Sequence, residues 1–146
     1  MVERSEDSPA VPEAVRGGYT EDEISHIYEL GRLHLENGNI VQAEVIMHGL
    51  NEVAPGFSAA WLASSYIAIQ HKDYEAAMHA AAQALRANPD STEAVLYLSA
   101  CLMTSGDFNS AGTYLGEVGE KIDTGLVDNP NFIRFYKAQL ARYQTR

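Results

Sequence analysis

The sequence predicts an all-α protein built from helical hairpins, and two observations lead to this prediction. Between residues 58 and 91, apolar residues recur with helical spacing on both sides of a short polar turn at 71–73. Moving this stretch along the chain so that Ala77 falls on Ala43, or on Ala111, keeps the pattern. Three units with one period are therefore expected to stack on a shared core, at about 24–57, 58–91 and 92–125.

Capping and turn residues predict where the helices of the first unit begin and end. Thr20 is followed three residues later by Glu23, which is the pattern of a capping box at a helix N-terminus. The first helix is therefore expected to start after Thr20 and to run to about Glu36. A polar turn that contains a glycine follows, and the partner helix is expected over 40–53, ending before Pro55.

The third unit follows the same plan. Ser91 or Thr92 can cap a helix that runs through Met103, and the polar turn at 104–107 leads into a second helix over about 108–122. No proline closes this unit, so we expect a longer and looser connection after it.

A further helix is predicted over about 129–144. Asp128 or Asn129 can cap it, and Pro130 occupies the first helical position, where proline is favoured. Stacked repeats need a cover over the exposed side of the last unit, and we expect this capping helix to supply it within a repeat domain spanning 19–146. Its apolar and aromatic residues are Phe132, Ile133, Phe135, Tyr136, Leu140 and Tyr143.

Composition and charge narrow the class of partner. The chain has 20 acidic and 10 basic residues, a formal net charge of −10 and a pI near 4.8. Nucleic acids and acidic membrane surfaces attract basic faces, so neither is expected as a partner. No apolar run approaches the roughly 20 residues that span a bilayer, and residues 1–18 combine acids with Pro, Gly and Ser. We therefore expect a cytoplasmic protein with a flexible acidic tail at 1–18.

Residue types that support catalysis or metal binding do not form a known pattern. The five histidines include no HExxH arrangement, and the single cysteine, Cys101, has no second cysteine for a zinc site or a disulfide. Cys101 lies among apolar residues of a predicted helix, where a small buried thiol is the usual case. No GxSxG, phosphate-loop or GxGxxG motif occurs. The sequence predicts a non-enzymatic protein with no catalytic residue, metal site or cofactor.

The repeated residues resemble the tetratricopeptide repeat family, whose helix-turn-helix units recur with a period of about 34 residues. The second helix of each unit begins with a large residue, alanine follows three residues later, and proline closes the first two units. The residues are Ile40, Tyr74 and Phe108; Ala43, Ala77 and Ala111; and Pro55 and Pro89.

This resemblance implies an α-α superhelix of three hairpins whose concave face is lined by the first helix of each unit. It also implies a protein or peptide client with apolar anchors that seats in this concave groove. The family's groove positions fall on Tyr28, Arg32, Leu35, Ala59, Leu62, Tyr66, Ile69, Leu96, Tyr97, Ala100 and Met103, with Glu93 on the same face.

A narrower resemblance concerns the class II chaperones of bacterial type III secretion, which are small, acidic and cytoplasmic and hold hydrophobic translocator subunits before export. The stretches 27–50 (IYELGRLHLENGNIVQAEVIMHGL) and 107–115 (DFNSAGTYL) are similar to their first and third units. The resemblance implies a chaperone for such a client and allows a homodimer. An alternative is an adaptor or scaffold subunit that mediates stable protein assembly, including a needle-subunit co-chaperone of the same machinery.

Overall fold

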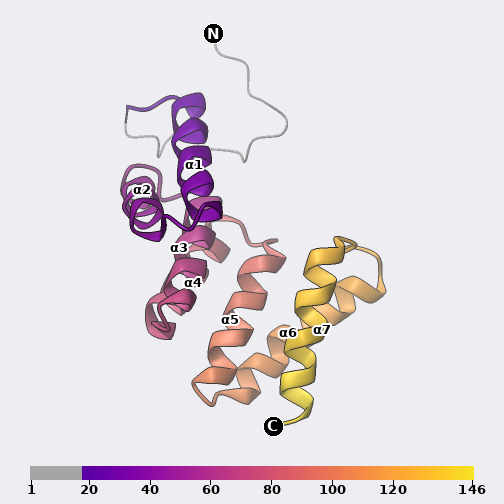
Figure 1. The fold of residues 1–146 in the computed structure, drawn as a ribbon. Helices are drawn as coiled ribbons and strands as arrows, with labels where there is room; N and C mark the ends of the chain where they lie inside the picture. Colours follow the sequence, from indigo (N-terminus) through magenta and orange to yellow (C-terminus); the bar gives the residue numbers. More distant parts are fainter. Residues whose placement is uncertain (1–17) are drawn as a thin grey trace.

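The computed structural model describes residues 18–146, and in this part of the chain it contains seven α-helices and no strand (Figure 1). The predicted all-α fold is confirmed. Apart from Gly18, the flexible tail expected at 1–18 lies outside the described residues. The helices are α1 (Glu21–Glu36), α2 (Ile40–Val53), α3 (Ser58–Gln70), α4 (Tyr74–Ala87), α5 (Thr92–Thr104), α6 (Phe108–Asp123) and α7 (Pro130–Gln144).

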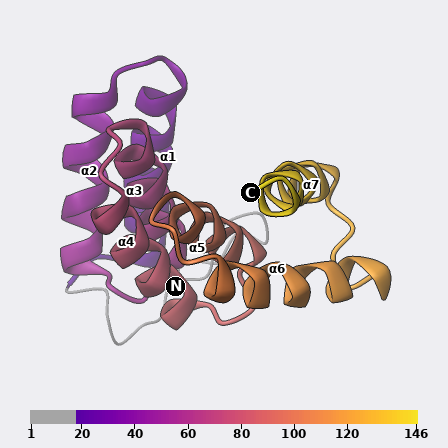
Figure 2. The same ribbon diagram turned by 90° about the horizontal axis from the view of Figure 1, so that it is seen from below.

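The first six helices pair into hairpins, α1 with α2, α3 with α4 and α5 with α6, and the hairpins stack through α2 on α3 and α4 on α5 (Figures 1 and 2). The middle hairpin packs closely because alanines line the inner side of α4, and Ser65 Oγ of α3 donates to the carbonyl oxygen of Ala77 at 2.8 Å. The core lies on either side of this hairpin. One cluster includes Ile24, Met47, Leu50 and Phe57, and the other includes Leu96, Met103, Leu115 and Val118.

The helix caps follow from the sequence. Thr20 Oγ1 accepts from the backbone N–H of Glu23, and the Glu23 carboxylate accepts from the N–H of Thr20, both at 3.0 Å, so the predicted capping box is confirmed. Ser91 caps α5 and Asn129 caps α7, each through its side-chain oxygen. These contacts satisfy N–H groups that the helices leave without an internal partner.

The three hairpin turns share one backbone conformation at equivalent positions of the repeat. Gly38, Lys72 and Gly106 all have positive φ, at 81°, 60° and 90°. Glycine adopts this left-handed region without steric cost, whereas Lys72 carries a Cβ that disfavours it. The repeat therefore extends to the backbone of the turns, even where the residue type departs from glycine.

The last helix, α7, contacts both α5 and α6, as expected for a capping helix (Figure 2). Two glycines of α6 make room for tyrosines of α7. A Cβ built on Gly119 would lie 2.5 Å from Tyr136 Oη, and one on Gly112 would lie 2.6 Å from Tyr143 Oη. On the α5 side, the rings of Tyr97 and Phe135 are 5.6 Å apart. None of the helices within 18–146 is both long and apolar enough to cross a membrane.

Candidate functional site

Two hollows open along the first helices of the hairpins and meet at a pair of tyrosines. The α1 hollow, of about 330 Å³, lies between α1, α3 and α5, and the α7 hollow, of about 470 Å³, lies between α3, α5 and α7. Tyr66 and Tyr97 line both, so the two hollows form one groove. The α1 hollow is also lined by Tyr28, Arg32, Leu35, Ala59, Leu62 and Glu93, and the α7 hollow by Ile69, Ala100, Cys101, Thr104, Phe135, Gln139 and Arg142.

The aromatic side chains of the groove are held by their neighbours. Tyr28 makes an edge-on contact with the buried ring of Phe57, with the ring centres 5.4 Å apart. Tyr97 packs against Phe135 and donates its hydroxyl to Glu93 Oε2 at 3.3 Å. Tyr66 is 37% exposed between them and offers its ring to solvent. The groove therefore presents aromatic side chains that are held in place by their neighbours, and aromatic surfaces of this kind can bury apolar side chains at low conformational cost.

The structure brings nine of the eleven predicted groove residues together along these two hollows, and their role in binding stays a prediction. The prediction is wrong for Leu96 and Met103, which do not line the groove. They are 0% and 4% exposed and pack in the cluster that includes Leu115 and Val118. The reason is that α5 contacts α4, α6 and α7 and is apolar on most of its circumference, so part of the expected groove face is core.

One wall of the groove was not predicted. Phe135, Gln139 and Arg142 of α7 line the α7 hollow, whereas the sequence indicated only first helices of the hairpins as groove walls. The amphipathic pattern of α7 predicted that it would pack on the last hairpin. No residue pattern indicates on which side of α5 it would lie.

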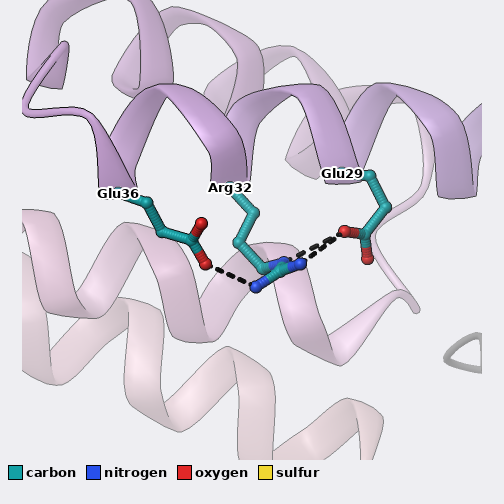
Figure 3. Close-up of polar contacts among 3 residues, drawn as sticks. All are labelled: Glu29, Arg32 and Glu36. Atoms are coloured by element: carbon teal, nitrogen blue, oxygen red, sulfur yellow. Dashed lines mark hydrogen bonds and ion pairs between the residues drawn. The ribbon is translucent and has the colours of Figure 1, made fainter.

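The charges of the α1 hollow are unevenly paired. Arg32 forms ion pairs with Glu29 at 2.9 Å and with Glu36 at 2.6 Å, and all three residues lie along α1 (Figure 3). These two carboxylates raise the pKa of the Arg32 guanidinium and offset its charge. The positive charge of Arg32 is thus already paired within α1.

Glu93 lies in the same hollow in a different environment. Burial raises the pKa of its carboxyl above the ordinary value of 4.5, and the hydrogen bond from Tyr97 opposes this shift. Burial and the Glu93 charge together raise the pKa of the Tyr97 hydroxyl, which therefore remains a hydrogen-bond donor at neutral pH. The groove can thus offer apolar contact and hydrogen bonds.

A third hollow, of about 540 Å³, lies against α2, α3 and α4. Asn51 and Ser64 line it, and Asn51 Nδ2 donates to Ser64 Oγ at 2.8 Å. Asn51 Oδ1 is buried with no partner among residues 18–146. Nowhere in these residues do three or more His, Cys, Asp or Glu side chains gather in a way that could hold a metal ion. Cys101 is fully buried, as predicted.

Comparison with known proteins places the fold. Residues 68–124 match the family model described as tetratricopeptide repeat. A search of curated protein sequences gives no match.

Among solved structures, the Yersinia enterocolitica type III secretion chaperone SycD in complex with a peptide of the translocator YopD is similar, with 16% identity and a TM-score of 0.73 over 86% of this chain and 95% of that chain. PcrH in complex with the chaperone binding region of PopD is similar at 16% identity and a TM-score of 0.73, over 88% of this chain and 93% of the other. The C-terminal TPR-containing domain of a Plasmodium falciparum FK506-binding protein also aligns, with 16% identity, a TM-score of 0.67 and coverage of 88% and 95%. At such identities the likeness establishes the fold alone.

Proposed function

We propose that this tetratricopeptide-repeat protein, which shares its fold with type III secretion chaperones, binds a segment of a client protein in the groove as a chaperone. The observation that carries the proposal is the row of aromatic and apolar side chains that three hairpins and α7 contribute to two connected hollows. Such a surface on a protein without a partner remains exposed to solvent, which favours the burial of an apolar client segment.

The client class we propose is a hydrophobic translocator of a type III secretion system, held in the cytoplasm before export. The similar structures support this choice, because SycD is seen with a peptide of YopD and PcrH with the chaperone binding region of PopD. In this chain the client would use the nine groove residues that the sequence indicated and the α7 wall.

A second candidate function is an adaptor or scaffold subunit in a stable assembly, and the first hairpin favours it. Leu30 and Leu33 of α1 and Val41 and Val45 of α2 are between 50% and 73% exposed. Exposed apolar side chains of this size are typical of protein interfaces. A needle-subunit co-chaperone or a homodimer would both use such residues.

The test compares wild-type protein with Tyr66→Glu. Each protein is immobilised and used to select from a phage library of random dodecapeptides. We expect wild type to enrich apolar peptides and Tyr66→Glu to lose them, because Tyr66 lines both hollows. Val41→Glu, a change at an exposed residue outside the groove, is the matched control and should select as wild type does. Circular dichroism should show that all three proteins remain helical.

A capture experiment addresses the client. Wild type and Tyr66→Glu are each used to retrieve proteins from a lysate of the source cells, followed by mass spectrometry. A protein with long apolar segments that is retrieved by wild type and lost with Tyr66→Glu would support the chaperone function. The same set of proteins from both would argue for the adaptor, with its contacts outside the groove.

A further inference from the structure

The groove holds two opposite charges that have no ion-pair partner among residues 18–146, one in each hollow. Glu93 lies in the α1 hollow and Arg142 in the α7 hollow, on either side of the shared tyrosines Tyr66 and Tyr97. Unpaired charges of opposite sign at two ends of an apolar groove are a means of selecting and orienting a bound chain.

The α1 hollow has an excess of negative charge. Its other charged lining residue, Arg32, is occupied by Glu29 and Glu36 along the same helix. Within the described part of the chain, Glu93 accepts a hydrogen bond only from the hydroxyl of Tyr97, which is neutral. The Glu93 carboxylate is half-buried, so a donor placed beside it would act in a medium where charge-assisted hydrogen bonds are strong. A lysine or arginine side chain of the client fits this position.

The α7 hollow has the reverse arrangement. Arg142 Nη2 donates to Thr104 Oγ1 at 3.1 Å, and Nη1 donates to Gln139 Oε1 at 3.0 Å. Both acceptors are neutral, so they hold the guanidinium against the groove and leave its charge in place. Arg142 is also close enough to Cys101 to oppose the rise that burial causes in the pKa of that thiol. An aspartate or glutamate of the client fits this end.

We propose that the groove selects client segments by charge, taking a basic side chain at Glu93 and an acidic side chain at Arg142 with apolar residues between them over Tyr66 and Tyr97. The inference deepens the proposed function and rests on it. The chain as a whole has a net charge of −10, which repels acidic segments at long range. Arg142 is then a local exception that admits an acidic residue at one place only.

The test uses the same random dodecapeptide phage library with wild type, Glu93→Gln and Arg142→Gln. We expect peptides selected by wild type to be enriched both in Lys or Arg and in Asp or Glu, on opposite sides of an apolar stretch. Glu93→Gln should lose the basic enrichment and keep the acidic one, and Arg142→Gln should do the opposite. Glu52→Gln and Arg134→Gln, which change exposed charges outside the groove, should select as wild type does.

A selected peptide then permits a double-mutant cycle by fluorescence anisotropy. Replacing its basic residue with glutamine should weaken binding to wild type about tenfold and binding to Glu93→Gln less than about twofold. If wild type, Glu93→Gln and Arg142→Gln all select apolar peptides with the same charged residues, the proposed selection by charge is wrong, while the proposed function as a chaperone still holds. A library from which wild type selects no peptide would overturn both. Thermal unfolding of each variant checks that the fold is retained.

Discussion

The two ends of the stack of hairpins differ in how their repeat positions are covered. Leu30, Ser64 and Leu98 occupy the same position in successive units, yet Leu30 is 50% exposed while Ser64 and Leu98 are each 8% exposed. Within 18–146, the later two units each have a preceding hairpin to pack on, and the first has none. The same repeat position is therefore core or surface according to its neighbour, which is a property of stacked repeats.

The surface of α2 differs from that of α4 and α6 in another way. Val41 and Val45 are exposed, whereas the corresponding residues of the later units are polar: Glu75 and Asn109, and His79 and Thr113. At the other end, α7 covers the last hairpin with aromatic side chains seated on glycines of α6. The C-terminal end is thus closed within the chain, and the first hairpin keeps apolar side chains in solvent.

The largest effect is expected from removing the cover. A chain that ends at Asp128 lacks α7 and exposes the core side of Phe108, Tyr97 and their neighbours. We expect a loss of at least roughly 3 kcal/mol in the free energy of unfolding, because several aromatic contacts are lost together. Urea unfolding followed by circular dichroism measures it. A shortened chain as stable as the whole one would show that α7 does not support the last hairpin.

The next comparison uses equivalent residues of the first and third units. Leu98→Ala should lower the free energy of unfolding by about 2–4 kcal/mol because a buried leucine leaves a cavity. Leu30→Ala should change it by less than about 1 kcal/mol, since that side chain is half in water. Equal losses from the two substitutions, measured by thermal unfolding, would mean that Leu30 is covered in solution.

Gly119 tests how α7 is seated. Gly119→Leu places a side chain where Tyr136 Oη lies 2.5 Å from the Cβ position, and we expect a loss of about 1–3 kcal/mol in the free energy of unfolding. A Cβ built on Gly116 of the same helix would meet no atom within 4 Å, so Gly116→Leu should stabilise the protein by up to roughly 1 kcal/mol, because leucine favours the helix over glycine. Urea unfolding of both variants measures the difference, and a stabilising Gly119→Leu would contradict the close seating of α7.

The smallest effect concerns Glu93, which lies between the covered and the open end. Because burial raises the pKa of this carboxyl above 4.5 in the folded state, its ionisation opposes folding. The folded protein is favoured while Glu93 is protonated, and this advantage is lost as the pH rises through the raised pKa. At pH 7, Glu93→Gln should therefore melt at a higher temperature than wild type. The gain in the free energy of unfolding should be less than about 1 kcal/mol, since the carboxyl group is partly solvated. The difference should shrink towards pH 4, and a difference that grows instead would contradict the assigned shift.

The sequence predicted the helices well because their ends carry strong local signals. Thr20 with Glu23, Pro130 after Asn129, and the prolines that close the first two units each act within a few residues of chain. The turns were predicted from the same kind of signal, although Lys72 shows that a turn can keep its conformation without glycine.

The groove was predicted less completely because its walls depend on packing. Most of the groove-lining residues from α1 and α3 were indicated by the resemblance to the tetratricopeptide family, because helices with the same phase turn the same positions to one face. Leu96 and Met103 share that phase but are taken into the core by the helices around α5. Arg142 was missed because its place depends on the side of α5 on which α7 lies, and helical periodicity has no information about that.

The dual position of α7 links stability to occupancy. Phe135 and Arg142 line the groove, and Tyr136 and Tyr143 pack the same helix against α6. A client bound against α7 would therefore also stabilise the packing of this last helix. A ligand that binds only the folded form adds about 2.7 kcal/mol at a hundredfold excess over its dissociation constant. Binding of a client would therefore raise the melting temperature of the protein. It would also make the last helix more resistant to proteases, which can be measured without a label.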